Sequence, residues 1–248
     1  SQAVLRDFAQ RKGITYPMLS DPESKVIRAF GILNPTVPPG PYFGVPYPGL
    51  FLIDERGVVK SKYFEDDYKE RYTAGDILTH EFGADGVGAT VLETPHLKLT
   101  WSASDSALQP GARTALILTV EPKPGMHLYA PGIEGGYIPI DWRMAESKAW
   151  TAQAAAYPPA KRLRLEAIHE TVPVYDSRIR LLRDITLVQQ NLLDPLLAPG
   201  RMLTVEGEFR YQACDAKVCY TPRTVPLKWT FRIGQLDRQR VPDALQRK

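Results

Sequence analysis

The apolar residues of this chain follow two different periods, and the change between them divides the sequence. Over residues 1–82, helical spacing alternates with short extended runs, whereas residues 91–234 alternate apolar and polar side chains with a period of two. A period of two directs one face of a strand toward a core and the other toward solvent. Many such runs between turn residues are typical of an antiparallel sandwich. The sequence therefore predicts a partial α/β segment followed by an all-β sandwich.

The first part contains start and stop signals for helices and a hairpin. Pro22 near the start of one helical run and Gly31 at its end are the usual punctuation of a helix. Glu-Arg-Gly57 joins two apolar runs and predicts a turn between strands. The expected elements are helices over 1–12, 21–31 and 73–82 and a hairpin of 49–54 with 58–64.

A glycine-rich stretch separates the two parts. Gly83-Ala-Asp-Gly-Val-Gly-Ala89 predicts a linker over residues 83–90, and a polar tail is expected over 235–248. Between them, the sequence predicts strands over 96–101, 114–120, 138–142, 178–182, 203–211 and 224–232.

Composition and charge argue against nucleic-acid binding and against a membrane-spanning helix. The chain is 44% hydrophobic and 24% charged with a net charge of +3, and no Lys/Arg run forms a basic stripe, so we expect no nucleic-acid partner. No apolar stretch approaches the roughly 18 residues of a membrane helix, so we expect no membrane span in this chain. The chain begins at Ser1 without an initiator Met, which suggests a processed or truncated product.

The only two cysteines, Cys214 and Cys219, are separated by four residues. Closing so short a loop restrains the unfolded chain by only about 2 kcal/mol, against nearly 5 for a long loop. A chain of this length can also bury a full hydrophobic core without a stabilising disulfide. The spacing favours thiol–disulfide exchange over a structural disulfide or two unrelated thiols, and those two alternatives stay open.

The residues around the cysteines predict a hairpin. Tyr211 ends one predicted strand and Tyr220 begins the next, so the two cysteines should face each other at disulfide distance. A structural zinc site needs four ligands, and none of the histidines has ligand spacing to the cysteines. We therefore expect no metal and no other cofactor. The four histidines are His80, His96, His127 and His169.

Two motifs in the first part, YPMLSDPESKVIRAFGIL and VPYPGLFLIDERGVV, resemble the AhpC/TSA-type redoxins of the thioredoxin-like superfamily. The resemblance implies a cis peptide bond at Pro48, beside the catalytic cysteine of that family. Redoxins carry this cysteine in an earlier half of the fold, and residues 1–82 contain none. This segment resembles only the second half of the redoxin fold, so it lacks a thiolate for peroxide chemistry. We expect its uncovered sheet edge to pack against the second domain or a neighbouring chain.

A second resemblance covers most of residues 90–234. The motif YQACDAKVCYTPRTVPL, with PGMHLYAPG, YIPIDW and VPVYDSRIRL upstream, is similar to the N-terminal domain of the thiol:disulfide interchange protein DsbD. The resemblance implies an immunoglobulin-like fold and assigns Cys214 and Cys219 as the exchanging pair. Their spacing is one residue shorter here than in DsbD itself.

The same resemblance implies a set of residues around the sulfurs. In the HLY segment His127 replaces an aromatic residue, and Glu166 falls at the start of a cap loop over 166–170. Ile168 stands where the family has a shielding aromatic, so the cap should shield less. The expected site neighbours are His127, Tyr129, Glu166, Tyr211 and Tyr220.

The sequence thus predicts a periplasmic or otherwise extracytoplasmic thiol:disulfide oxidoreductase that works through Cys214 and Cys219. Its expected partner is a thioredoxin-like or redoxin protein. An intact upstream domain of its own chain is one candidate for this partner. One alternative is a non-catalytic interaction sandwich braced by the disulfide, and another is a fragment of a thiol peroxidase. The direction of electron flow, the oligomeric state and the first sulfur attacked stay open.

Overall fold

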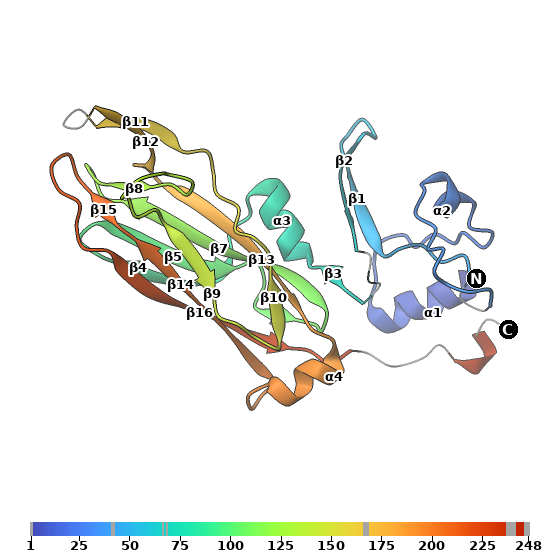
Figure 1. Cartoon of the computed structure of the whole chain (residues 1–248). Coiled ribbons are helices and arrows are strands. Elements are labelled where there is room, and N and C mark those ends of the chain that lie inside the picture. The colour runs from blue at the N-terminus through green and yellow to red at the C-terminus, as the bar shows by residue number, and fades with distance from the viewer. Residues whose placement is uncertain are drawn as a thin grey trace. The chain divides into compact units, whose positions relative to one another are not determined.

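The computed structural model describes residues 2–40, 43–65, 67, 69–165, 169–236 and 242–245. The chain divides into two compact units, residues 1–71 with 237–248 and residues 72–236, both drawn in Figure 1. Strands dominate the described residues, and most of their pairings are antiparallel. This structure, mostly β with antiparallel sheets and few helices, confirms the antiparallel β part of the predicted fold class.

The first unit contains the first two predicted helices and the predicted hairpin. The carboxylate of Asp21 accepts from the backbone N–H groups of Lys25 (2.9 Å) and Ile27 (3.0 Å), so the second helix begins after Asp21 and is shorter than predicted. On the hairpin, the ring of Phe51 lies 5.6 Å from Phe30 and 4.9 Å from Phe64. The elements are α1 (Gln2–Lys12), α2 (Lys25–Ala29), β1 (Gly49–Ile53), β2 (Val59–Phe64) and the short 3-10 helix η2 (Asp243–Leu245).

The peptide bond at Pro48 is trans, which corrects the prediction of a cis bond there. Leu33 and Pro46 form an antiparallel bridge, and the N–H of Tyr47 donates to the carbonyl of Ile32 at 2.8 Å. Pro48 follows at a bend directly before β1, which begins at Gly49. All peptide bonds are trans in the described part of the chain, so the expected cis bond at Pro48 is not formed.

The second unit is built on two sheets that enclose one core. In the larger sheet the strands run in the order β10-β13-β7-β5-β4, and in the facing sheet β6-β16-β14-β9. The larger sheet comprises β4 (Val87–Glu93), β5 (Leu97–Ala103), β7 (Ala112–Pro122), β10 (Trp150–Ala152) and β13 (Ile179–Leu187), and the short β3 (Arg71–Tyr72) also pairs with β7. The facing sheet comprises β6 (Ala107–Leu108), β9 (Asp141–Met144), β14 (Met202–Tyr211) and β16 (Arg223–Ile233).

Alternating side chains on these strands make the core, as the period of two predicts. On β16, every second residue from Val225 to Ile233 is buried and those between are exposed. Two indoles tie the sheets together, because Trp101 Nε1 donates to the carbonyl of Lys228 (3.1 Å) and Trp229 Nε1 donates to that of Ser102 (2.9 Å). Two short helices follow β13, α4 (Gln190–Leu193) and η1 (Asp194–Leu196).

A smaller sheet lies at one end of the sandwich (Figure 1). Its strands run in the order β11-β12-β8-β15. Their bounds are β8 (His127–Tyr129), β11 (Lys161–Leu165), β12 (Glu170–Tyr175) and β15 (Ala213–Cys214). This sheet positions the cysteine pair.

The boundary between the units lies earlier in the chain than the predicted linker. It falls within β3 (Arg71–Tyr72), so α3 (Ala74–Phe82) belongs to the sandwich unit, and the predicted linker contains the start of β4 at Val87. Tertiary contacts explain the difference, because His80 of α3 bonds Asp184 of β13 at 2.8 Å and Arg180 donates to the carbonyl of Gly83 at 2.6 Å. Among the described residues, no helix is long and apolar enough to cross a membrane.

Candidate functional site

Cys214 and Cys219 form a disulfide across a tight turn. On one side of the pair, the N–H of Tyr220 donates to the carbonyl of Ala213 at 2.8 Å, and on the other, Asp215 N–H donates across the turn at 2.9 Å. The cysteines lie between these bonds as a non-hydrogen-bonded pair with their Cα atoms 4.0 Å apart. Such pairs bring side chains closest together in antiparallel strands, at about 4.5 Å between Cα atoms. The hairpin geometry therefore brings the two sulfurs together.

The carboxylate of Asp215 organises the turn between the cysteines. Its Oδ1 accepts from the backbone N–H groups of Lys217 (2.7 Å) and Val218 (2.8 Å), and its Oδ2 accepts from the hydroxyl of Tyr220 (2.8 Å). The bonds from Lys217, Val218 and Tyr220 lower the pKa of Asp215. The bond to Asp215 in turn raises the pKa of Tyr220, whose ring also lies 4.3 Å from that of His96. Asp215 is thus kept ionised next to the sulfurs, where its charge opposes a thiolate.

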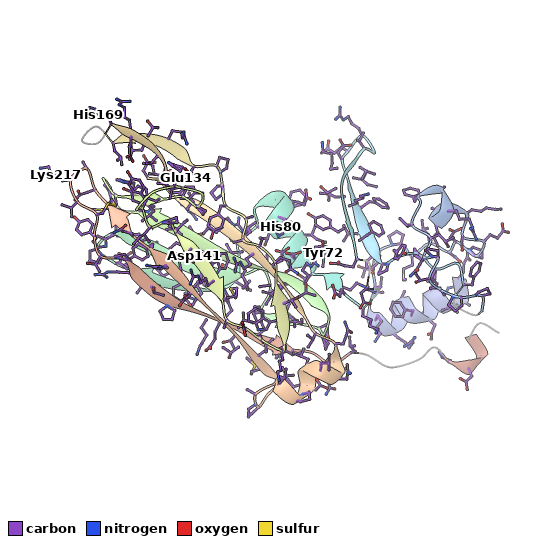
Figure 2. The ribbon with its side chains drawn as sticks, viewed as in Figure 1. Tyr72, His80, Glu134, Asp141, His169 and Lys217 are labelled. Atoms are coloured by element: carbon purple, nitrogen blue, oxygen red, sulfur yellow. A yellow bond between two sulfur atoms is a disulfide. The ribbon has the colours of Figure 1, made fainter. Side chains whose placement is uncertain are left out.

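The two cysteines differ in their access to solvent. Cys214 is only 1% exposed, whereas Cys219 is an exposed residue at the end of the turn. Lys217 of the same turn lies at the end of the sandwich in Figure 2. The hydroxyl of Tyr129 lies 3.5 Å from the sulfur of Cys219. An incoming thiol therefore reaches Cys219 more readily than Cys214.

Strand β8 lies against the buried cysteine. Cys214 pairs with His127 in the antiparallel register of β15 and β8, and Tyr129 pairs with Val174 on the other edge of β8. Tyr129, Val172, Val174 and Cys214 form a small buried cluster separate from the main core. The structure thus brings two predicted site neighbours, His127 and Tyr129, to the disulfide.

His127 is buried without a hydrogen bond at one ring nitrogen. The residue is 6% exposed, and its Nε2 has no hydrogen-bond partner among the described residues. Burial lowers the pKa of His127, so the imidazole is neutral at pH 7. The same effect raises the pKa of Tyr129, whose ring meets that of His127 edge-on at 5.5 Å.

A second tyrosine, Tyr137, extends this aromatic group and was not predicted. Its ring lies 4.7 Å from that of Tyr129, and its hydroxyl donates to the carboxylate of Glu170. This bond raises the pKa of Tyr137 to about 12. Glu170 is the last residue of the predicted cap loop, whereas Glu166 and Ile168 lie outside the described residues. No periodicity links Tyr137 to the HLY segment, so only the folded loop reveals the contact.

Tyr211 occupies a different place from the one the resemblance implies. It is 1% exposed in the main core, its ring stacks on Phe209 at 6.0 Å, and its hydroxyl donates to Thr94 Oγ1 at 3.3 Å. Cys214 belongs to the smaller cluster. Tyr211 therefore supports the strand that leads to the disulfide.

One further cluster, on α3 and β13, contains groups that bind metals in other proteins. Ligand atoms of Asp76, His80 and Asp184 lie within 4.8 Å of one another. The bonds to Asp184 and then Asp76 raise the pKa of His80 to about 10, so the ring is a cation at pH 7. Burial raises the pKa of Asp76 despite its bond to His80, which identifies Asp184 as the main partner. With Arg113 also close to Asp76, the carboxylates are balanced by side-chain cations.

The fold and this site define a β-sandwich module that carries one half-exposed disulfide. The family model for the N-terminal domain of the thiol:disulfide interchange protein DsbD matches residues 97–228, more than half of the chain. The chain belongs to this family. The AhpC/TSA family model matches residues 1–62.

The sequence identity between this chain and the individual proteins it is similar to is low. No curated protein matches the sequence. The N-terminal periplasmic domain of ScsB from Proteus mirabilis is 12% identical with a TM-score of 0.38, and the match covers 57% of this chain and 49% of that one. The chain thus spans about half the length of this ScsB structure. The GAE domain of yeast GGA1 is 8% identical with a TM-score of 0.30, covering 56% of this chain and 96% of that one.

Proposed function

We propose that this chain exchanges electrons with a thioredoxin-like protein through the Cys214–Cys219 disulfide, outside the cytoplasm. The observation that carries the proposal is the asymmetry of the pair, with Cys219 exposed and Cys214 1% exposed beside the neutral His127. The family match supports a thiol:disulfide exchange module. A stable disulfide also fits an oxidising compartment, where such bonds persist.

The exchange runs in two balanced steps. A thiolate of the partner attacks the sulfur of Cys219, the bond to Cys214 breaks, and its electron pair goes to the Cys214 sulfur, which takes up a proton. The partner's second cysteine, as a thiolate, then attacks the partner's first sulfur in the mixed disulfide and releases the Cys219 thiolate, which takes up the second proton. Two electrons and two protons pass from the partner dithiol to this chain, and the reverse sequence returns them to an acceptor disulfide.

The residues of the small sheet have separate parts in this scheme. The Tyr129 hydroxyl, 3.5 Å from the Cys219 sulfur, is placed to donate a hydrogen bond to the thiolate that forms there. His127 lies opposite Cys214 in the register, with a ring nitrogen buried and unpartnered within the described part of the chain. We assign His127 a positioning role at the leaving sulfur of Cys214.

The surface around Cys219 suits a thioredoxin-like partner. Val218, which is 54% exposed, stands next to Cys219 and offers an apolar contact at the point of attack. Lys217 is exposed in the same turn and offers a positively charged side chain to the partner. The redoxin likeness of residues 1–62 makes a redoxin domain that carries its own cysteine one member of the partner class.

Trapping with single-cysteine variants tests the proposal. The Cys214→Ala variant keeps the accessible sulfur, so it should form a mixed disulfide with a thioredoxin-like protein whose remaining active-site cysteine carries a thionitrobenzoate. The matched variant Cys219→Ala keeps only the buried sulfur and should react at least tenfold more slowly. Equal rates, or a faster Cys219→Ala variant, would contradict the assigned order of attack, and no adduct with either variant would contradict the exchange function.

A further inference from the structure

A cleft of about 540 Å³ opens at the β9 edge of the sandwich and is lined from both sheets. Asp141 on β9, labelled in Figure 2, marks its position. The facing sheet contributes Arg143 and Arg210, and β13 of the larger sheet contributes Arg183. The cleft thus gathers three guanidinium groups and a single carboxylate.

Most of this positive charge is left without a partner. The carboxylate of Asp141 accepts from Arg143 Nε at 2.5 Å. Arg183 is half-buried, and its Nε has no hydrogen-bond partner among the residues described. The side chain of Arg210 makes no hydrogen bond or ion pair with any described residue. Leaving a buried donor unpaired costs about 1–3 kcal/mol, and more when the group is charged.

Packing holds Arg183 in this position. Its guanidinium lies over the ring of Trp142 at 5.2 Å, and burial lowers its pKa. The titratable groups that face it are the carboxylate of Asp141 and the neutral hydroxyl of Tyr157. The hydroxyl of Tyr157 accepts from the backbone N–H of Trp142 at 3.4 Å, so its own proton remains available to another acceptor. The cleft wall therefore carries the guanidinium of Arg183, whose Nε is buried and unpaired among the described residues, and the hydroxyl of Tyr157, whose proton is free.

The remaining walls are apolar. They are formed by Pro131, Ile138, Pro139, Ile140, Ala154 and Ala155. A cleft of several hundred cubic ångströms with apolar walls and a few fixed polar groups is the usual form of a small-molecule site. A guanidinium prefers planar oxyanions, to which it donates two parallel bonds.

We propose that this cleft binds a small organic anion, with its carboxylate on Arg183, Arg210 and Tyr157 and its apolar body against the isoleucine and proline walls. The site is separate from the disulfide in its residues, although Tyr129, which contacts Cys219, is bridged to Pro139 of the cleft. Binding therefore does not require the exchange function.

Titration of the full, oxidised chain with benzoate tests the site, with benzamide as the neutral ligand of the same shape. The indole N–H resonance of Trp142 is the reporter, because this group is buried, has no described hydrogen-bond partner and lies under Arg183. We expect saturable shifts with benzoate and at least tenfold weaker binding of benzamide at equal ionic strength. Equal responses to the two ligands, or no saturable shift, would overturn the proposal.

Two variants identify the anchor. Arg183→Met keeps the stem over Trp142 and removes the charge, so it should weaken benzoate binding at least tenfold, whereas Arg162→Met, on the exposed β11, should bind as the wild type does. Wild-type affinity in Arg183→Met would contradict the site. If Arg183→Met fails to fold, Arg210→Met takes its place, because Arg210 is exposed, and a loss of less than twofold there would also overturn the proposal.

Discussion

The two units of the chain differ in how far their apolar side chains are buried. In residues 72–236 the core includes Phe209 and Phe231, each fully buried. In residues 2–71, no hydrophobic side chain is buried among those described, and Leu19 is 91% exposed. A two-stranded hairpin is marginal by itself, because one of its faces needs a second layer. The sandwich supplies that layer within its own sequence, whereas the first unit does not.

The same contrast holds for the chemistry. Both sulfurs lie in the sandwich, on a hairpin fixed by Asp215, and residues 1–82 contain no cysteine. The first unit is similar to a redoxin in sequence over residues 1–62 but lacks the group that does redoxin chemistry. Burial and both cysteines are therefore concentrated in residues 72–236.

A pair of phenylalanines gives the largest test of this contrast. Phe209→Ala on β14 should destabilise the sandwich by about 3–5 kcal/mol, the usual loss for a fully buried ring. Phe51→Ala on β1, where the ring is half-buried between Phe30 and Phe64, should cost only about 1 kcal/mol. Denaturant unfolding measures both. Equal losses would show that the first unit has a core of its own.

The charge cluster on α3 should have the next largest effect. The pKa of His80 rises from 6.5 to about 10 in the folded chain, so its stabilisation is complete below pH 6.5 and is lost as pH rises through 10. His80→Gln should lower the free energy of unfolding by about 2–3 kcal/mol at pH 6, since a charge-assisted hydrogen bond to Asp184 and an ion pair with Asp76 are lost. The gap to the wild type should close above pH 10.

A matched control separates this effect from a general change of charge. His169→Asn replaces an exposed histidine at a positive φ of 57°, a conformation that asparagine tolerates. Its unfolding free energy should follow that of the wild type from pH 6 to above 10. A His80 gap that does not change with pH would contradict a protonated His80.

Removing the disulfide should have a smaller effect. The double variant Cys214→Ala/Cys219→Ala should lose about 2 kcal/mol, because the closed loop is short. The β16 and β14 core should keep its cooperative transition. A loss above about 4 kcal/mol would favour the alternative in which the bond braces the sandwich.

The cap of α3 should give the smallest change. Thr73 Oγ1 accepts from the N–H of Asp76 at 3.0 Å and donates to Asp105 at 2.6 Å. Thr73→Ala should therefore cost about 1 kcal/mol. Thr73→Ser keeps the hydroxyl and should recover most of that loss. An unchanged unfolding midpoint in Thr73→Ala would remove α3 from the stable part of the sandwich unit.

Local sequence predicted the long strands of the sandwich, because a strand with one buried face carries its own period, but not β4, β10 or the short strands β8, β11 and β12. Strand β16 was expected over 224–232 and runs from Arg223 to Ile233, and the C-x4-C hairpin formed as expected. The unit boundary was missed because it depends on contacts such as His80 with Asp184, 104 residues apart. Tyr137 and the core position of Tyr211 were missed for the same reason, since both depend on which loops meet after folding.

The reduction potential of the Cys214–Cys219 pair tests the central claim most directly. The oxidised chain is equilibrated in glutathione or dithiothreitol buffers, and the free thiols are counted at each potential. An exchanging pair should have a potential above about −300 mV, within reach of thioredoxin-like partners. A value well below that limit would mark a structural bond and contradict the exchange function.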